Sequence, residues 1–340
     1  GADALRLTLA ALTLQGRDIF LSEGRIETYR FFLNKLWNAA RFALMNLEDA
    51  HHDIGVMDDS ALRVHDRWIM ARVSAVTDEM TRLLDGYFFG ESARLMYDFV
   101  WGELCDWYLE LSKPALRGDE GDTRKRATQS VLFVVFRDVL KLLHPVIPFT
   151  TEELWSAFGY GDALIGRSEW PAARHVRGGD EASAVMESVQ TIVRAMRNLR
   201  AEIKMPPQQE APRMCLKLKD PSARSHVTEN DDLIRLLTRV NEIEIMPEDA
   251  PKPPRSISYV TGAWEIFFPV GDLLDVDKEV VRLRTESEKL SKEADRIRGK
   301  LSNKNFTDRA PADVVLKDRA ALEDAESRIS RIEENISGLR

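Results

Sequence analysis

The chain has 340 residues, of which 44% are hydrophobic and 31% charged, and these values are typical of two or three folded domains. Its formal net charge of −8 argues against a protein that coats nucleic acid indiscriminately, so a polyanion would have to bind to local basic faces. No apolar run approaches the ~20 residues that span a bilayer, and no secretory signal opens the chain. Cys105 and Cys215 are far apart and outside any CxxC pattern, which indicates neither a disulfide framework nor a cysteine zinc site and favours the reducing cytoplasm.

The first half of the chain is predicted to be entirely helical. Apolar residues recur at helical spacing, and Ser22, Asp59 or Ser60 and Thr150 or Thr151 stand where helix N-caps are expected. Long amphipathic helices with short connections are typical of a bundle, so we predict a helical-bundle domain over 1–165. Its helices are expected at 4–12, 22–47, 61–84, 88–111 (before Pro114), 122–143 and 150–159.

The pattern changes beyond a Gly- and Pro-rich linker at 159–180. One more helix is predicted at 183–205, where Pro206 and Pro207 halt it. Four segments then alternate or carry β-branched residues, like strands, and a helix is expected between the first two, at 231–240. We therefore predict a linker helix and a small α+β junction module over 166–272, with strands at 213–219, 242–246, 256–260 and 263–270.

The end of the chain, over 273–340, carries the clearest pattern. Hydrophobic residues follow 4,3,4,3 spacing from Val276 to Leu301 and resume it from Val315 to Leu339, with Asp318 in one of the slots. Two heptad arms around a Pro-containing loop at 302–311 predict an antiparallel coiled-coil hairpin. Each arm of about 26 residues would extend about 40 Å. The charged faces outside the seam indicate an arm that projects into solvent.

Motifs for catalysis and metal binding are missing from the sequence. It holds no GxGxxG after a strand, no Walker loop and no HExxH, and no set of Ser, His and Asp residues suggests a nucleophilic site. We therefore predict no catalytic residues, no metal site and no cofactor in this chain. Its expected role is to bind and position another molecule.

The segment from Phe31 to Leu47 is unusual for a packing helix. At about 100° per residue it has two faces. One face is small and aliphatic (Phe32, Leu36, Ala39, Ala40, Ala43 and Leu47), and Trp37 and Arg41 lie at its boundary. The other combines rings, amides and a cation (Phe31, Asn34, Lys35, Asn38, Phe42 and Met45).

Two interpretations of the second face remain open from the pattern alone. Unstacked bases need a ring to stack on, amides for base edges and cations for phosphates, so the face suits single-stranded nucleic acid. Alternatively, Phe31, Phe42 and Met45 pack beneath a neighbouring helix, and the polar residues lie at its rim.

Several longer stretches resemble the valyl-tRNA synthetase family of bacterial type. GADALRLTLAAL opens the chain, the arm carries KLSNKNF, and between them lie QGRDIFLSEGRIETYRFFLNKLWNAARF, DRWIMARV, LCDWYLELSK, LHPVIPFTTEELW and VRAMRNLRAEIKMPP. The resemblance covers essentially the whole chain. The cysteine zinc module that often ends the isoleucyl relative is missing here.

The resemblance implies a C-terminal piece of a longer enzyme. The family signatures of the ATP site, His-Ile-Gly-His and Lys-Met-Ser-Lys-Ser, do not occur, so the catalytic and editing domains are expected to be outside this chain. The parent would use ATP with magnesium to activate valine and transfer it to its tRNA. This piece is expected to be inactive alone, cytoplasmic and monomeric, and to bind tRNA(Val) but neither DNA nor a membrane.

The resemblance also implies which residues bind the RNA. In the family the bundle binds the anticodon, and valine anticodons end in adenine and cytosine. The matching recognition helix would use Asn34, Lys35, Asn38, Arg41 and Phe42. The hairpin leans on the outer corner of the tRNA in the family, and the candidate contacts there are Arg282, Arg284, Lys289, Lys292, Arg296, Arg298 and Lys300.

Two alternatives remain. The chain could be the same region of an isoleucyl- or leucyl-tRNA synthetase. It could also be a helical protein-interaction scaffold whose coiled coil pairs with another protein, although the heptad seam is expected to be satisfied by folding back on itself. For each arm cation, a solvated coiled-coil surface is an equally good interpretation.

Overall fold

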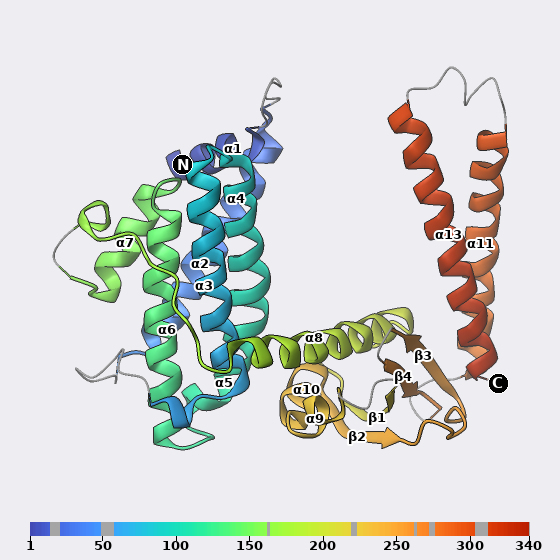
Figure 1. Cartoon of the computed structure of the whole chain (residues 1–340). Coiled ribbons are helices and arrows are strands. Elements are labelled where there is room, and N and C mark those ends of the chain that lie inside the picture. The colour runs from blue at the N-terminus through green and yellow to red at the C-terminus, as the bar shows by residue number, and fades with distance from the viewer. Residues whose placement is uncertain are drawn as a thin grey trace. The chain divides into compact units, whose positions relative to one another are not determined.

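The computed structural model of the chain describes residues 1–13, 21–48, 58–161, 164–218, 223–261, 264–271, 276–302 and 312–339 (Figure 1). These residues are mainly helical with one small sheet, which confirms the predicted fold class. The chain divides into two compact units, Gly1–Glu187 and Ser188–Arg340. The predicted division into three parts with boundaries at 165 and 272 stays a prediction.

The first unit is a bundle of long helices packed around an apolar core (Figure 1). Buried residues recur along one face of each long helix, as the amphipathic pattern predicts. Its elements are α1 (Ala2–Leu12), α2 (Glu23–Met45), η1 (Asp59–Ala61), α3 (Val64–Asp85), α4 (Phe89–Asp98), η2 (Phe99–Tyr108), α5 (Leu109–Arg117), α6 (Asp122–Leu143), α7 (Pro148–Phe158) and η3 (Ile165–Arg167).

One helical rod of this unit differs from the sequence-based expectation. The rod begins with α4, passes through the π-helical segment η2 and ends with α5, so it continues past Pro114 to Arg117. Proline removes one helical hydrogen bond, and here the carbonyl that loses its donor belongs to Glu110, an exposed residue that water can reach. The helix ends instead at Gly118, whose φ of 86° forms a left-handed C-cap.

The N-terminus of α7 is also capped differently from the prediction. Proline occupies its first position, and neither Thr150 nor Thr151 provides an N-cap side chain. Instead, the buried Asp3 of α1 accepts hydrogen bonds from the Thr150 backbone N and hydroxyl, both at 2.6 Å. A carboxylate at a helix N-terminus is favourable because it balances the helix dipole. The cap therefore comes from 147 residues away in the sequence.

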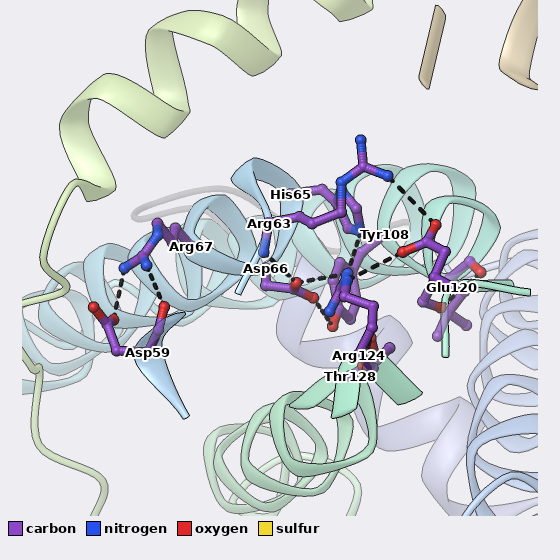
Figure 2. Close-up of polar contacts among 11 residues, drawn as sticks. Asp59, Arg63, His65, Asp66, Arg67, Tyr108, Glu120, Arg124 and Thr128 are labelled. Atoms are coloured by element: carbon purple, nitrogen blue, oxygen red, sulfur yellow. Dashed lines mark hydrogen bonds and ion pairs between the residues drawn. The ribbon is translucent and has the colours of Figure 1, made fainter. Parts of the chain in front are cut away.

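A buried polar cluster joins α3, η2 and α6 (Figure 2). Asp66 is fully buried, and its Oδ2 lies 2.7 Å from Arg124 Nη2. Tyr108 donates its hydroxyl to Asp66 Oδ1 at 2.9 Å, and the backbone N of Arg63 donates to Oδ2 at 2.9 Å. Glu120 pairs with Arg124 Nε at 3.2 Å. The carboxylate of Asp66 is thus satisfied from three sides, as a buried charge requires.

The segment after η3 crosses the surface of α3 and α6. Ser74 donates its hydroxyl to the Arg174 carbonyl at 2.8 Å, and Trp170 Nε1 donates to Thr81 Oγ1 at 2.9 Å. Lys141 of α6 donates to the Glu169 carbonyl at 2.9 Å. These contacts hold an otherwise irregular stretch against two helices, which satisfies part of its backbone polarity.

The second unit contains a four-stranded mixed sheet with the strand order β2-β1-β4-β3. Strands β1 and β2 are parallel, and β4 is antiparallel to both β1 and β3. Arg200 of α8 donates to the Thr238 carbonyl at 2.8 Å, which ties α8 to α10. The elements are α8 (Gly179–Glu202, which begins in the first unit), β1 (Ala211–Leu218), α9 (Arg224–Thr228), α10 (Asp231–Thr238), β2 (Val240–Met246), β3 (Ser256–Val260) and β4 (Trp264–Pro269).

The same unit ends in the predicted hairpin of two long helices, α11 (Val276–Ser302) and α13 (Ala312–Leu339), which lie side by side (Figure 1). The heptad residues Val280, Leu283, Leu290, Ala294 and Ile297 are buried between the helices, as a coiled-coil seam requires. Most of the loop predicted at 302–311 lies outside the described residues. At about 1.5 Å per residue, the 27 residues of α11 extend about 40 Å.

We expect the Asp66 cluster to contribute strongly to the stability of the bundle. Asp66→Ala leaves the Arg124 guanidinium buried without its closest carboxylate, so it should lower the free energy of unfolding by about 3–5 kcal/mol. Denaturant unfolding measures the loss. Glu79→Ala, which breaks an exposed i,i+3 pair with Arg82 on the same helix, is the matched control and should leave the midpoint unchanged. Equal effects of the two substitutions would contradict the role of the cluster.

Candidate functional site

Helix α2 has one packed face and one open face. Phe32, Leu36, Ala39, Ala40 and Ala43 are the buried residues of the helix. On the other side, Phe31 is 52% exposed, Trp37 43% and Met45 64%. A neighbouring helix would cover these side chains if they belonged to the core, so the packing interpretation does not describe this face.

Three of the predicted binding residues present unused polar groups on the open face. Asn34, Asn38 and Arg41 are exposed, and none of them forms a hydrogen bond or ion pair within the described parts of the chain. Phe42 is half-buried, so part of the residue remains accessible. This arrangement offers two amides, a cation and a ring edge to a ligand.

Lys35 is placed differently from these residues, because the neighbouring segment η2 holds its side chain. Its ammonium Nζ lies 2.5 Å from Asp106 Oδ1 and 4.0 Å from the centroid of the Trp101 ring. An ion pair and a cation–π contact therefore fix a half-buried Lys35 at the border between α2 and η2. Lys35 is not a free cation, and a ligand that reaches it also meets Asp106.

Aromatic rings continue from Lys35 along α4 and η2. Trp101 stacks on Tyr97 with ring centroids 5.6 Å apart, and Tyr97 stacks on Phe32 of α2 at 5.1 Å. Tyr29 meets the edge of Tyr97 at 6.1 Å. Tyr97 of α4 and Trp101 of η2 were not predicted as part of the site, although their i,i+4 spacing predicts that the two rings share a helical face.

The predicted arm cations fall into two groups. Arg284, Lys289, Lys292 and Arg296 are exposed and form no ion pair within the described residues. The other three make internal contacts. Arg298 pairs with Asp295 and Glu326, Lys300 Nζ lies 3.5 Å from Asp318 Oδ2, and Arg282 Nη1 lies 2.8 Å from Glu286 Oε2.

The base of the arm is fixed to the sheet and to α8 through a polar joint. The buried Asn335 of α13 donates to Glu202 Oε2 at 2.7 Å and accepts from the Ser258 backbone N at 3.3 Å. Arg282 Nη2 donates to the Glu202 carbonyl at 2.5 Å. Gly338 lies so close to β3 that a side chain there would meet the Ser256 carbonyl. The arm is therefore held both by polar contacts at its base and by apolar packing between its two helices.

The pKa of the Glu202 carboxyl is raised at this joint. Burial raises the pKa of its carboxyl, and Arg331 together with the hydrogen bond from Asn335 only partly opposes this effect. The joint thus favours the protonated form of Glu202 relative to a carboxyl in water.

The described residues contain neither a metal-binding cluster nor a membrane-spanning helix. They hold no group of three or more His, Cys, Asp or Glu side chains placed to bind a metal ion. Among them, no helix is long and apolar enough to cross a membrane.

Two family models match the chain. Residues 66–215 match the anticodon-binding domain of tRNA ligases, and residues 275–340 match the tRNA-binding arm of valyl-tRNA synthetases. The first match begins at Asp66 of the buried cluster and covers the rod that holds Lys35, and the second coincides with the hairpin. The part of the bundle from Asp66 onward and the arm thus match regions of the tRNA ligase class, and α2 lies outside the first match.

Curated relatives give a finer assignment. A valine–tRNA ligase of Syntrophotalea carbinolica is 38% identical over 100% of this chain and 38% of its own length. Those of Petrotoga mobilis and Thermotoga maritima are each 37% identical over 98% of this chain and 37% of their own length. The chain belongs to the valyl-tRNA synthetase family, which confirms the resemblance seen in the sequence, and it spans a little more than a third of the length of these relatives.

The raised pKa of Glu202 predicts a pH-dependent stability of the second unit. A carboxyl whose pKa is raised by folding stabilises the fold most when protonated, and this contribution is lost as pH rises from about 4.5 through the folded pKa. Glu202→Gln stays neutral and keeps an acceptor for Asn335, so it should become progressively more stable than the unmodified chain over that range. Thermal unfolding between pH 4.5 and 7 measures the difference. Glu333→Gln, at an exposed position of α13, should show no such trend, and parallel pH curves for all three proteins would contradict the prediction.

Proposed function

We propose that the chain is the tRNA-binding, C-terminal part of a valine–tRNA ligase and that its partner is tRNA(Val). The open face of α2 is the observation that carries the proposal, because it presents rings, amides and cations where the core needs none. The matches to an anticodon-binding domain and a tRNA-binding arm support it independently.

The open face suits the unstacked bases of an anticodon loop. The accessible ring of Phe42 stacks on a base, while Asn34 and Asn38 present donors and acceptors to base edges. Arg41, which has no internal partner within the described residues, attracts a phosphate or a base. Lys35 contributes a cation whose position is set by Asp106 and Trp101.

The arm suits the sugar–phosphate surface of the tRNA body, and its two helices are unequal in charge. Helix α11 has eight basic and six acidic residues, whereas α13 has four basic and seven acidic ones. On a helical projection, three of the cations without internal partners (Lys289, Lys292 and Arg296) lie opposite the buried seam, and Arg284 lies beside it. We therefore assign the RNA-facing surface of the arm to α11, where phosphate contacts release counterions.

The chemistry belongs to the rest of the parent enzyme in this proposal. That enzyme joins valine to tRNA(Val) with ATP and magnesium, and this chain supplies recognition without a cofactor or catalytic residue of its own. Holding the tRNA in one orientation accelerates the parent reaction by presenting the acceptor end to the active site. The chain is proposed to act in the cytoplasm as a monomer.

The names of the relatives favour the valyl assignment over an isoleucyl or leucyl one. A protein-interaction scaffold is less well supported, because the apolar seam of the hairpin is buried between its own two helices. The exposed faces of the hairpin are mostly charged, with Val281 as an exposed apolar exception.

Retention of tRNA from a total pool tests the proposal directly. The immobilised chain should enrich tRNA(Val) over the isoleucine and leucine tRNAs, and the bound fraction should fall as salt rises because phosphate contacts contribute to binding. Sequencing of the retained RNA provides the readout. Enrichment of another tRNA would reassign the chain within the class, and retention of none would contradict tRNA binding.

Phe42→Ala tests the assignment of the open face. Loss of a base–aromatic stack should weaken binding to tRNA(Val) by roughly 1–3 kcal/mol, as measured by fluorescence anisotropy or calorimetry. Phe149→Ala removes another accessible phenyl ring, 67% exposed on α7, and should have no effect. The assignment is wrong if both variants bind tRNA(Val) as tightly as the unmodified chain.

A further inference from the structure

Asp106 is an acidic residue inside a surface that is otherwise suited to bind a polyanion. Its side chain is 47% exposed, and its Oδ1 lies 2.5 Å from Lys35 Nζ. The second carboxylate oxygen, Oδ2, makes no hydrogen bond to the described residues. One oxygen is therefore held by the lysine, and the other is left to accept a hydrogen bond from a ligand.

The neighbouring groups fix the direction of this carboxylate. Lys35 is held by the Trp101 ring at 4.0 Å as well as by Asp106. Trp101 and Asp106 are five residues apart within the π-helical segment η2. A π-helix repeats at i,i+5, so both residues lie near the same side of the segment, whereas an α-helix would set them about 140° apart.

An ordinary surface ion pair is the simplest alternative explanation for these contacts. Such pairs contribute little to stability, and this one places a negative charge beside a surface proposed to receive RNA. Repulsion of phosphates is unfavourable for affinity there. Positioning Lys35 uses only one oxygen of this carboxylate, and the other can recognise a hydrogen-bond donor of the ligand.

We propose that Asp106 is a specificity-determining residue that selects an anticodon base with an exocyclic amino group. The proposal rests on the proposed function, in which the open face of α2 binds the anticodon. An ionised carboxylate only accepts hydrogen bonds, and aspartate accepts from the amino group of cytosine. Adenine has an amino group at the corresponding edge.

Guanine and uracil present a carbonyl oxygen where adenine and cytosine have the amino group. Two acceptors that face each other cannot form a hydrogen bond, and the carboxylate would be desolvated without compensation. Asp106 therefore rejects a keto base more than it attracts an amino base. Both of the last two bases of a valine anticodon, adenine and cytosine, satisfy this requirement.

Lys35 and Asp106 then act as a pair in which the ammonium interacts with phosphates and the carboxylate recognises a base. The ammonium offsets the negative charge next to the RNA backbone, so the carboxylate is tolerated near phosphates. The cation–π contact with Trp101 removes much of the rotational freedom of the lysine before the ligand arrives, which lowers the entropic cost of ordering the pair on binding.

The test compares three tRNA(Val) transcripts: the unmodified one and two with single changes in the anticodon, the penultimate adenine to guanine and the last cytosine to uracil. Asp106→Asn keeps the shape of the side chain but adds an amide NH2 group, which can donate a hydrogen bond to the carbonyl oxygen of guanine or uracil. We expect the affinity ratio of the unmodified transcript over at least one keto variant to fall by at least about fivefold. Equilibrium binding at fixed salt measures the ratios.

Two further variants separate recognition from general electrostatics. Asp106→Ala removes the acceptor without adding a donor, so it should weaken binding of the unmodified transcript slightly and improve binding of the keto variants, which lose an unfavourable contact. Glu110→Gln changes a comparable exposed acid, paired with Lys113 on α5, and should leave all three ratios unchanged. Thermal unfolding of each variant checks that the fold is retained.

The outcomes distinguish the two proposals. If the unmodified chain binds all three transcripts equally, anticodon recognition by the bundle fails and the role of Asp106 fails with it. If the unmodified chain discriminates and Asp106→Asn keeps the same ratios, only the role of Asp106 is overturned. An equal change of the ratios in Glu110→Gln would also overturn it, because it would show a nonspecific effect of charge.

Discussion

The candidate binding surface exists because only one narrow stripe of α2 packs against the rest of the bundle. Ala39, Ala40 and Ala43 are at most 6% exposed, and their small side chains let neighbouring elements approach the helix axis closely. Phe32 and Leu36 fill the same stripe with larger side chains. Burial along this stripe provides the hydrophobic stabilisation of the helix, so the opposite face is not needed for folding. That face can carry rings and amides that remain accessible to a ligand.

The π-helical segment η2 gives this surface a second wall. Phe99, Leu104 and Tyr108 are buried, so packing compensates for the less favourable hydrogen-bond geometry of a wide helix. The altered repeat turns Trp101 and Asp106 towards Lys35 together. The same segment ends at Tyr108, whose hydroxyl donates to Asp66 at 2.9 Å in the buried cluster. The candidate binding surface and the buried cluster therefore share one segment, η2.

Periodicity predicted the elements well because it reports on burial directly. The helix expected at 122–143 is α6 with the same bounds, and the strand expected at 256–260 is β3. The two faces of α2 also followed from spacing, because exposure on a helix repeats with the helical turn. The family resemblance supplied the candidate binding residues, which spacing alone left undecided between core and surface.

Several features that were not predicted depend on contacts distant in the sequence. Thr150 or Thr151 was predicted to cap α7 locally. The cap is instead Asp3, whose carboxylate accepts a hydrogen bond from the Thr150 backbone N. The π-helical register of η2 is set by packing, and no residue type marks it. Asn335 fixes the arm through Glu202 and Ser258, yet in the sequence it is an ordinary polar residue of a coiled coil.

The distribution of charge explains how an acidic chain can suit an RNA partner. With a net charge of −8, the long-range field repels RNA, and screening limits each charge to a Debye length of about 8 Å at physiological salt. On the two proposed surfaces, attraction comes from cations that have no internal partner among the described residues, Arg41 on α2 and the exposed group on α11. A nucleic acid that meets only one of these surfaces gains little against the overall repulsion. A nucleic acid that contacts both surfaces gains from each, so two weak contacts on one molecule add to its affinity.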